Sequence, residues 1–215
     1  MKNYESNAEI ICLTNGQMDT NSYIISSLRT DRAIVIDPAD GRRIHDYLES
    51  ENLEPYYIIN THGHYDHISG NRYLVEKYGV PVCISPLDSD YLTDPGLNMS
   101  LFFSGEYTSP KADVYLEENK IIQLDDIMIK IISTPGHTPG SISLALNDIV
   151  FTGDLVFKNG IGRTDLPGGD IEALTDSLKN VFMKIKYENT IFPGHGESGK
   201  KIEFDSVLQQ FFYTY

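Results

Sequence analysis

The sequence of 215 residues contains no tryptophan and only two cysteines, and its 17 basic residues are outnumbered by 31 acidic ones. The formal net charge of −14 disfavours nucleic acid as a partner, because contact with phosphates requires a basic surface. No apolar run approaches the ~18 residues that cross a membrane, and the first residues lack an apolar signal core. We therefore expect a cytoplasmic protein with no nucleic-acid partner and no membrane partner.

Several common sequence signatures are also missing or incomplete. The sequence has no Gly-x-Ser-x-Gly, so a serine hydrolase is unsupported. Residues 194–199 fit the glycine spacing of a dinucleotide-binding loop, but too few residues follow for a helix, a strand and a ribose-binding acid. Residues 194–200 also resemble a phosphate-binding loop, but Lys201 stands where a Ser or Thr is needed. Cys12 and Cys83 lie in apolar runs, which predicts buried free thiols.

Histidine is scarce but concentrated. Residues 61–67 read Thr-His-Gly-His-Tyr-Asp-His, directly after an apolar run, and hold three of the six histidines. An extended backbone would place residues 62, 64 and 66 on one face, and His67 would join them if the chain turns as a helix begins near Asn71. Imidazole and carboxylate groups at this spacing suit a transition metal, zinc above all. A polar surface loop is the weaker interpretation.

Three further candidates follow apolar runs in loops marked by glycine or proline. His137 lies in Pro-Gly-His-Thr-Pro-Gly, Asp154 ends the run that begins at Ile149, and His195 follows Phe-Pro-Gly. Function gathers at such loops on a rigid scaffold. The remaining histidine, His45, falls in a helical pattern and is expected to face solvent without a functional role.

These motifs, in this order, resemble the metallo-β-lactamase superfamily over residues 10–195. The stretch Gly160–Gly169 is similar to the glyoxalase II-like branch, the hydroxyacylglutathione hydrolases and their short bacterial relatives. The resemblance implies an α+β fold of the αββα type, a sandwich of two mixed β-sheets with helices on both outer faces. It also implies that one metal is held by His62, His64 and His137. A second metal would be held by Asp66, His67 and His195, and Asp154 would bridge the two metals.

The resemblance further implies two divalent metal ions, zinc first, with iron or manganese as alternatives. A water between two such ions loses a proton near neutral pH, and an ion can polarise a carbonyl oxygen. Asp66 would act as the catalytic carboxylate that orients the hydroxide or accepts its proton. The expected function is a metal-dependent hydrolase, a glyoxalase II-like thioesterase that cleaves S-acyl small thiols such as S-lactoylglutathione by a metal-bridging hydroxide.

Two other functions are weighed against this one. A persulfide dioxygenase of the same fold holds one iron through two histidines and an aspartate, which His62, His137 and Asp154 could supply. A metal sensor or scaffold protein is disfavoured, because seven candidate ligands exceed the four of a closed structural zinc site.

No polar linker divides the sequence, so we expect a single metallo-β-lactamase-like domain over residues 1–215. Full-length glyoxalase II enzymes carry a C-terminal helical domain that binds glutathione, and residues 196–215 are too few for one. The reaction class is therefore predicted more firmly than the thiol, and the oligomeric state stays open.

Other residues near these motifs have two interpretations each. Asp37 either binds a ligand imidazole or only forms a turn before a proline. Arg163 and Asp165 either pair structurally, which we favour, or touch substrate. Tyr65 is a candidate for facing the substrate. The apolar segment 94–113 is either a lid or a loop pinned to the core.

Hydrophobic periodicity and turn residues predict an alternating arrangement in two halves. The expected strands are Ile10–Leu13, Ser22–Ser26, Ala33–Ile36, Tyr56–Asn60, Val82–Ile84, Val114–Leu116, Ile121–Leu124, Ile127–Ile132, Ser141–Leu146 and Ile149–Thr152. The expected helices are Arg42–Ser50, Asn71–Tyr78, Ile171–Lys184 and one around Glu203–Phe212. The αββα topology comes from the resemblance rather than from this pattern.

Overall fold

The computed structural model describes residues 2–4, 7–103 and 105–214. Its strands are β1 Lys2–Tyr4, β2 Ala8–Asn15, β3 Thr20–Ser27, β4 Arg32–Ile36, β5 Glu54–Ile59, β6 Val82–Ile84, β7 Val114–Tyr115, β8 Ile121–Leu124, β9 Ile127–Ser133, β10 Ile142–Leu146, β11 Ile149–Gly153, β12 Val156–Phe157, β13 Gly160–Ile161, β14 Thr190–Pro193 and β15 Gly199–Lys200. Its α-helices are α1 Gly41–Ser50, α2 Tyr65–Ile68, α3 Asn71–Tyr78, α4 Ser100–Phe103, α5 Ile171–Asn180 and α6 Asp205–Thr214. The 3-10 helices are η1 Pro86–Leu92, η2 Phe182–Lys184 and η3 Lys201–Phe204.

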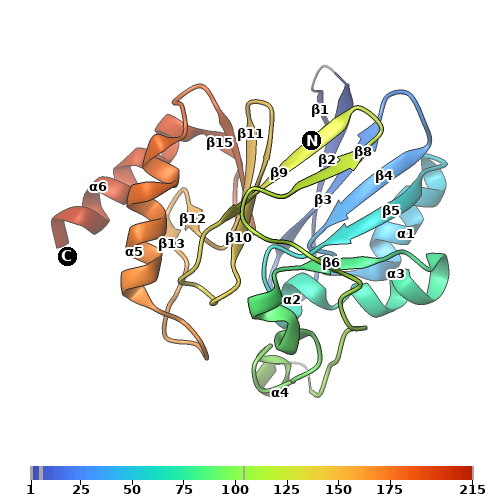
Figure 1. Cartoon of the computed structure of the whole chain (residues 1–215), viewed down its shortest axis with the longest axis horizontal. Helices are drawn as coiled ribbons and strands as arrows, with labels where there is room; N and C mark the ends of the chain where they lie inside the picture. Colours follow the sequence, from blue (N-terminus) through green and yellow to red (C-terminus); the bar gives the residue numbers. More distant parts are fainter. Residues whose placement is uncertain (1, 5–6, 104, 215) are drawn as a thin grey trace.

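The strands form two mixed sheets and a separate hairpin. The first sheet has the order β1-β2-β3-β4-β5-β6-β7, antiparallel as far as β4 and parallel from β4 to β7. The second has the order β15-β14-β11-β10-β9-β8, in which β11 and β14 are the parallel pair. Strands β12 and β13 form the hairpin. In Figure 1 the strands lie between α1 and α3 on one side and α5 and α6 on the other.

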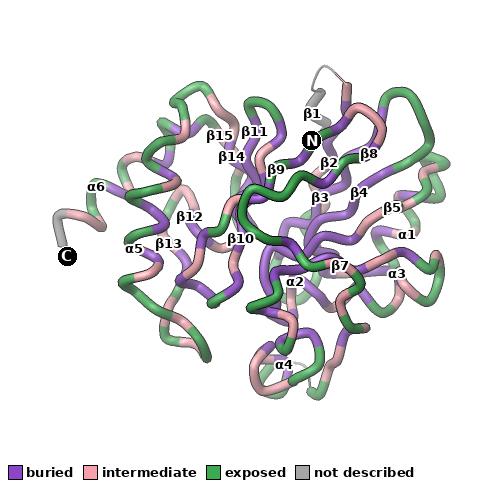
Figure 2. Tube along the Cα trace, viewed as in Figure 1, coloured by how far each residue is buried: buried purple, intermediate pink, exposed green. Residues whose placement is uncertain are grey.

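Three apolar layers hold this arrangement together. The central layer joins the inner faces of the two sheets, where Ile10 and Ile34 of the first lie in one cluster with Leu144 and Phe151 of the second. A second cluster packs α1 and α3 on the first sheet, and a third packs α5 and α6 on the second. Buried segments run through both sheets in Figure 2. The αββα prediction is therefore confirmed, because each sheet buries one face on the other sheet and one on helices.

Local sequence explains most element boundaries. Strand β9 alternates buried isoleucines with exposed residues, as a strand with one face in the core should. Asp40 caps the start of helix α1, because its side chain accepts hydrogen bonds from the backbone N–H groups of Arg42 and Arg43. Helix α3 ends at Gly79 with φ of 66°, the left-handed conformation that glycine adopts freely. These ends agree with the sequence to within one residue.

The helix expected over 171–184 is shorter than predicted. Helix α5 ends at Asn180, and the chain passes through Val181, with φ −113° and ψ −68°, into the 3-10 helix η2. That break buries Phe182 against Phe204 of η3. Cys83 is buried and free as expected, whereas Cys12 is only half-buried. Among the described residues, none of the helices is long and apolar enough to cross a membrane.

Candidate metal centre

The candidate ligands gather at one edge of both sheets, where strands from each half end. The first sheet supplies the loop after β5 and helix α2, and the second supplies the loops after β9, β11 and β14. The residues brought together are His62, His64, Asp66, His67, His137, Asp154 and His195. All seven residues predicted from the sequence therefore meet in space.

The backbone conformation of residues 62–67 differs from the extended one predicted for residues 62–66. The backbone is extended only as far as His64, with ψ of 146°, and helix α2 begins at Tyr65. Asp66 and His67 are thus presented by a helical turn, not by a strand face shared with residues 62 and 64. The turn comes earlier than predicted, because the short helix α2 precedes α3.

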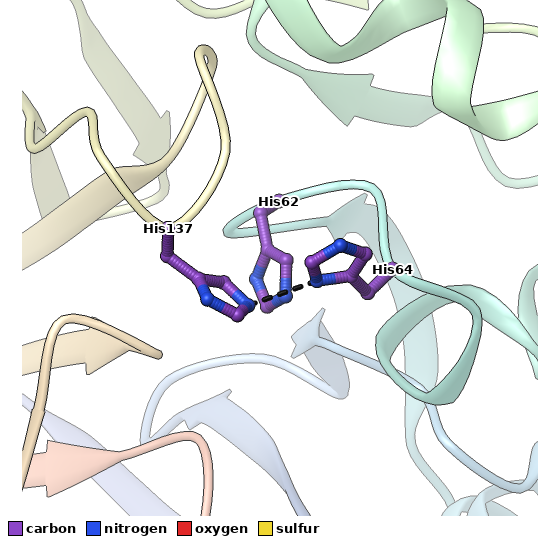
Figure 3. Close-up of side chains that lie close together, drawn as sticks. All are labelled: His62, His64 and His137. Atoms are coloured by element: carbon purple, nitrogen blue, oxygen red, sulfur yellow. Dashed lines mark hydrogen bonds between the residues drawn. The ribbon is translucent and has the colours of Figure 1, made fainter. Parts of the chain in front are cut away.

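The first group of ligand atoms is buried. His62, His64 and His137 offer nitrogens that all lie within 4.8 Å of one another. Nδ1 of His64 lies 2.9 Å from Nε2 of His137, as the dashed line in Figure 3 shows. Burial and the neighbouring imidazoles lower the pKa of His64 to about 3 and hold that of His62 well below its usual value. Neutral rings leave a lone pair available for a cation.

The second group carries a carboxylate and two imidazoles. Oδ2 of Asp66 lies 3.3 Å from Nε2 of His67 and 3.2 Å from Nε2 of His195. Burial opposes the charge on both rings, but nearby carboxylates overcome it and raise the pKa of His67 to about 9 and of His195 to about 11.

Asp154 lies between the two groups. One carboxylate oxygen is 3.4 Å from Nε2 of His67, and the other is 3.5 Å from Nε2 of both His137 and His195. Burial would raise the pKa of Asp154, but the surrounding imidazoles lower it to about 2. One carboxylate in reach of ligands from both groups has the placement that a bridging ligand requires.

The outer nitrogens of four histidines are held by acceptors, which turns their inner nitrogens toward the centre. Nδ1 of His67 donates to Asp37 at 2.9 Å, Nδ1 of His137 to the Arg163 carbonyl at 2.7 Å, and Nδ1 of His195 to the Met18 carbonyl at 3.1 Å. Nδ1 of His62 lies 3.1 Å from the hydroxyl oxygen of Thr61, and that hydroxyl donates to Asp37. Of the two interpretations of Asp37, the imidazole-binding one is confirmed.

The residues fit a pair of divalent cations. Nε2 of His62 and one oxygen of Asp154 are buried without a hydrogen-bond partner within the described part of the chain. An unpaired buried polar atom costs roughly 1–3 kcal/mol, which a coordinated cation would offset. Imidazole and carboxylate together suit zinc, iron or manganese. This donor chemistry fits divalent metal ions, as expected from the sequence.

Asp88, which the sequence did not single out, joins the two halves of the site. It is fully buried and accepts from the backbone N–H of Gly63 at 2.9 Å, the N–H of Gly140 at 2.7 Å and the hydroxyl of Thr138 at 2.7 Å. Gly63 lies between two ligands of the first sheet, and Thr138 and Gly140 follow the ligand of the second. The carboxylate therefore fixes His62 and His64 relative to His137.

Two smaller features were also missed. The Thr20 hydroxyl donates to Oδ2 of Asp66 at 2.8 Å and so restricts the rotation of that carboxylate. At Gly194 a Cβ atom would lie 2.2 Å from Oδ1 of Asp154 and 2.8 Å from Cε1 of His67. This close approach explains a glycine that sequence spacing alone placed in two incomplete nucleotide-binding motifs.

A cavity of about 300 Å³ opens on the cluster. Tyr65 lines it and stacks on Phe103, with ring centroids 6.2 Å apart. In the segment 94–113 the Asn98 side chain donates to the carbonyls of Tyr91 and Tyr107, and Met99 and Phe103 line the cavity. The pinned-loop interpretation is therefore the better one, with Phe103 added to the pocket.

Two other expectations have simple outcomes. Arg163 pairs with Asp165 through two hydrogen bonds of 2.8 and 2.7 Å, at the exposed rim of the cavity rather than beneath the site. His45 lies outside the cluster but does not face solvent freely, because its Nδ1 is 2.6 Å from the Tyr78 hydroxyl. That contact joins α1 to α3.

Known proteins resemble this chain over most of its length. The chain is 34% identical over 185 residues to the probable metallo-hydrolase YqgX of Bacillus subtilis, which covers 84% of this chain and 87% of the relative. It is 31% identical over 198 residues to the hydroxyacylglutathione hydrolase GloC of Haemophilus influenzae, covering 88% and 91%.

Two solved structures share both fold and sequence with it. The B3 metallo-β-lactamase BLEG-1 superposes with a TM-score of 0.85 at 31% identity, covering 90% of this chain and 95% of the other. The di-iron-bound form of TTHA1623 superposes with a TM-score of 0.81 at 29% identity, covering 92% and 98%. Residues 15–195 match the family described as the metallo-beta-lactamase superfamily. The chain therefore belongs to the metallo-β-lactamase superfamily.

Proposed function

We propose that this chain is a metal-dependent hydrolase of the glyoxalase II-like branch, a thioesterase that cleaves S-acyl small thiols. The observation that carries the proposal is Asp154, whose two oxygens reach ligands of both groups at 3.4–3.5 Å. A shared carboxylate is the arrangement needed for two cations side by side, which is the setting for hydrolysis of a carbonyl compound.

The names of the relatives also support a metal-dependent hydrolase. YqgX is named as a metallo-hydrolase and GloC as a hydroxyacylglutathione hydrolase. The solved structure of TTHA1623 contains two irons, which favours a pair of cations in this chain as well. Zinc, iron and manganese all suit the ligand set, and zinc is the first choice because imidazole and carboxylate at a tetrahedral site are its usual ligands.

In this proposal each group would hold one cation and Asp154 would contact both. Bound there, the cations would lower the pKa of a water molecule and polarise a substrate carbonyl. Asp66 is ionised, since its pKa lies below the usual range, and its Oδ2 accepts from Thr20. Its ionised carboxylate is therefore suited to orient a water by accepting a hydrogen bond from it. The thiolate of a thioester is a good leaving group, so the site does not require a strong general acid.

The dioxygenase alternative needs fewer residues than the site contains. A single iron held by His62, His137 and Asp154 would leave Asp66, His67 and His195 without a ligand role. The tight placement of those three side chains, with inner atoms within 4.8 Å of one another, favours the hydrolase.

Purified protein loaded with zinc, manganese or iron tests the proposal. A panel of acyl-thiols, with thiol release followed by a colour reagent, should show turnover that does not depend on oxygen and that falls on chelation. Oxygen uptake with glutathione persulfide and hydrolysis of a chromogenic β-lactam serve as parallel assays. Oxygen consumption without thioester cleavage would establish the dioxygenase instead.

A further inference from the structure

The cavity beside the candidate metal centre has apolar walls. Its floor contains His64, His137 and His195 together with both carboxylates of the cluster. Its walls come from the β2–β3 turn, the α4 segment and the β12–β13 hairpin with the loop after it. The apolar wall residues are Met18, Met99, Phe103, Phe157, Ile161 and Leu166. An apolar wall around a polar reaction centre recognises a substrate by excluding water from its hydrocarbon part.

The basic side chains nearest to this cavity already have acidic partners. Arg163, at its rim, makes two hydrogen bonds to Asp165. Lys158, in the adjoining hollow beside Phe157 and His195, lies 2.9 Å from Glu203 and 3.4 Å from Glu197. A glutathione carboxylate would have to share either basic side chain with its acidic partner.

The hollow on the other side of Tyr65 offers no better anion site. It measures about 780 Å³ and is lined by Arg42 and Arg43, but the same wall holds more acidic side chains than basic ones. Those acidic side chains are Asp19, Asp40, Asp66 and Glu106. The side chains lining this hollow therefore give the carboxylates of glutathione more acidic than basic neighbours.

Hydrogen bonding and ring stacking attach the apolar wall to the helix that carries Asp66. The carbonyl of Asn98 accepts from the backbone N–H of Tyr65 at 2.8 Å, which ties the α4 segment to the helix that presents Asp66. Met99, the next residue, has φ of 69°, a strained conformation for a residue with a side chain. Phe103 then stacks on Tyr65 with an angle of 14° between the rings. The wall is thus fixed relative to the ligands.

We propose that this pocket binds an uncharged apolar arm of the substrate next to the scissile carbonyl. The preferred substrates are then alkyl-acyl thioesters of uncharged thiols, ahead of S-lactoylglutathione. This proposal rests on the proposed thioesterase function. Each methylene that enters the pocket should raise kcat/KM about fourfold, the equivalent of about 0.8 kcal/mol per buried CH₂.

The test uses metal-loaded protein and acetyl, butyryl and hexanoyl thioesters of N-acetylcysteamine, with S-lactoylglutathione as comparator. A second series holds the acetyl group constant and lengthens an uncharged alkyl thiol. Rising kcat/KM in either series supports the proposal and identifies the arm in the pocket. Flat kcat/KM in both series, or S-lactoylglutathione as the best substrate, would overturn it.

Two variants of the cavity wall and one control test whether the apolar arm binds in this cavity. Phe103→Ser removes an apolar wall and should flatten the chain-length dependence, and Met18→Ser should do the same from the opposite wall. Phe102→Ser is the control, because Phe102 is 68% exposed on the same helix and does not line the cavity. If kcat/KM rose equally with chain length in all three variants, the selectivity would come from another part of the molecule and the proposal would be wrong.

Direct binding separates this proposal from the thioesterase function. Unreactive S-methyl and S-hexyl thioethers of N-acetylcysteamine are titrated into the metal-loaded protein by calorimetry. Tighter binding of the hexyl compound, lost in Phe103→Ser, supports the pocket even if no thioester is cleaved, in which case only the proposed function fails. Cleavage of thioesters together with equal thioether affinities would contradict the pocket and leave the function standing.

Discussion

The two groups of candidate ligands differ in charge and in access to solvent. In the first, His62, His64 and His137 are at most 4% exposed, and burial lowers the pKa of His62 and His64. In the second, the His195 side chain is 27% exposed and the Asp66 side chain 14%, and the imidazoles are charged when no cation is present. The first group is ready to bind a cation, whereas the second must first release protons.

The supports of the two groups differ in the same way. Asp88 joins the loops of the first group across both sheets with three buried hydrogen bonds. The second group depends on separate contacts: Asp37 on His67, the Met18 carbonyl on His195 and the Thr20 hydroxyl on Asp66. We expect the first cation to bind more tightly, because its ligands are held as one unit.

The largest effect is expected at the residue common to both groups. Asp154→Ala removes the carboxylate that reaches both sets and should reduce turnover on the order of 10³-fold or more. Steady-state kinetics with a thioester measures the loss. Circular dichroism should show an unchanged fold, because the apolar layers lie away from these loops. Near-normal turnover would show that the shared carboxylate is not needed.

The second group should make cation binding depend steeply on pH. Both His67 and His195 have raised pKa values, about 9 and about 11, so both are protonated at pH 7 without a cation. Coordination requires both to lose a proton, so affinity for the second cation should rise about 100-fold per pH unit near pH 7. Calorimetry in two buffers of different ionisation enthalpy counts the protons. Release of none would contradict the difference between the groups.

Weakening the shared support should affect the first group selectively. Asp88→Asn replaces a carboxylate oxygen by an NH₂ group that cannot accept from all three donors, and should lower affinity for the first cation roughly 10–100-fold. Competition with a chelator provides the measurement. The control is Asp90→Asn, an exposed residue of the same 3-10 helix. Equal losses in the two variants would remove Asp88 from its positioning role.

The smallest effect is expected outside both groups. His45→Ala loses the contact with Tyr78 that joins α1 to α3, which should cost about 1 kcal/mol of stability and leave turnover nearly unchanged. Urea unfolding and the thioester assay check the two parts. If turnover fell as far as in Asp154→Ala, the separation of this histidine from the cluster would be wrong.

The sequence revealed the side chains of the site better than their supports. Histidine and aspartate in glycine-marked loops are visible in the residue order, and Asp37 was suspected from its place at a strand end. The carbonyls of Arg163 and Met18 carry no such signal, because any residue has a carbonyl and only the tertiary fold aims it. Asp88 lies in Pro-Leu-Asp-Ser-Asp, which reads as a surface turn until both sheets close on it.

The elements show the same limit. Strands with alternating or wholly apolar patterns, such as β9 and β6, were found within a few residues, since burial on the sheets produces those patterns. The short helix α2 was not, because a four-residue helix has no periodicity, and its first turn interrupts an alternating His-x-His pattern. The break at Val181 was missed as well, because it depends on the packing of Phe182 against Phe204.

Counting the cations bound by each group tests the account most directly. Metal-free protein is titrated with zinc, with elemental analysis of the product and NMR of the histidine rings, beside His64→Ala and His195→Ala. The account predicts two cations per chain in the unaltered protein and one in each variant, with His67 and His195 coordinated only when the second cation is bound. Saturation of the unaltered protein at one cation, with His67 and His195 still carrying their protons, would contradict it.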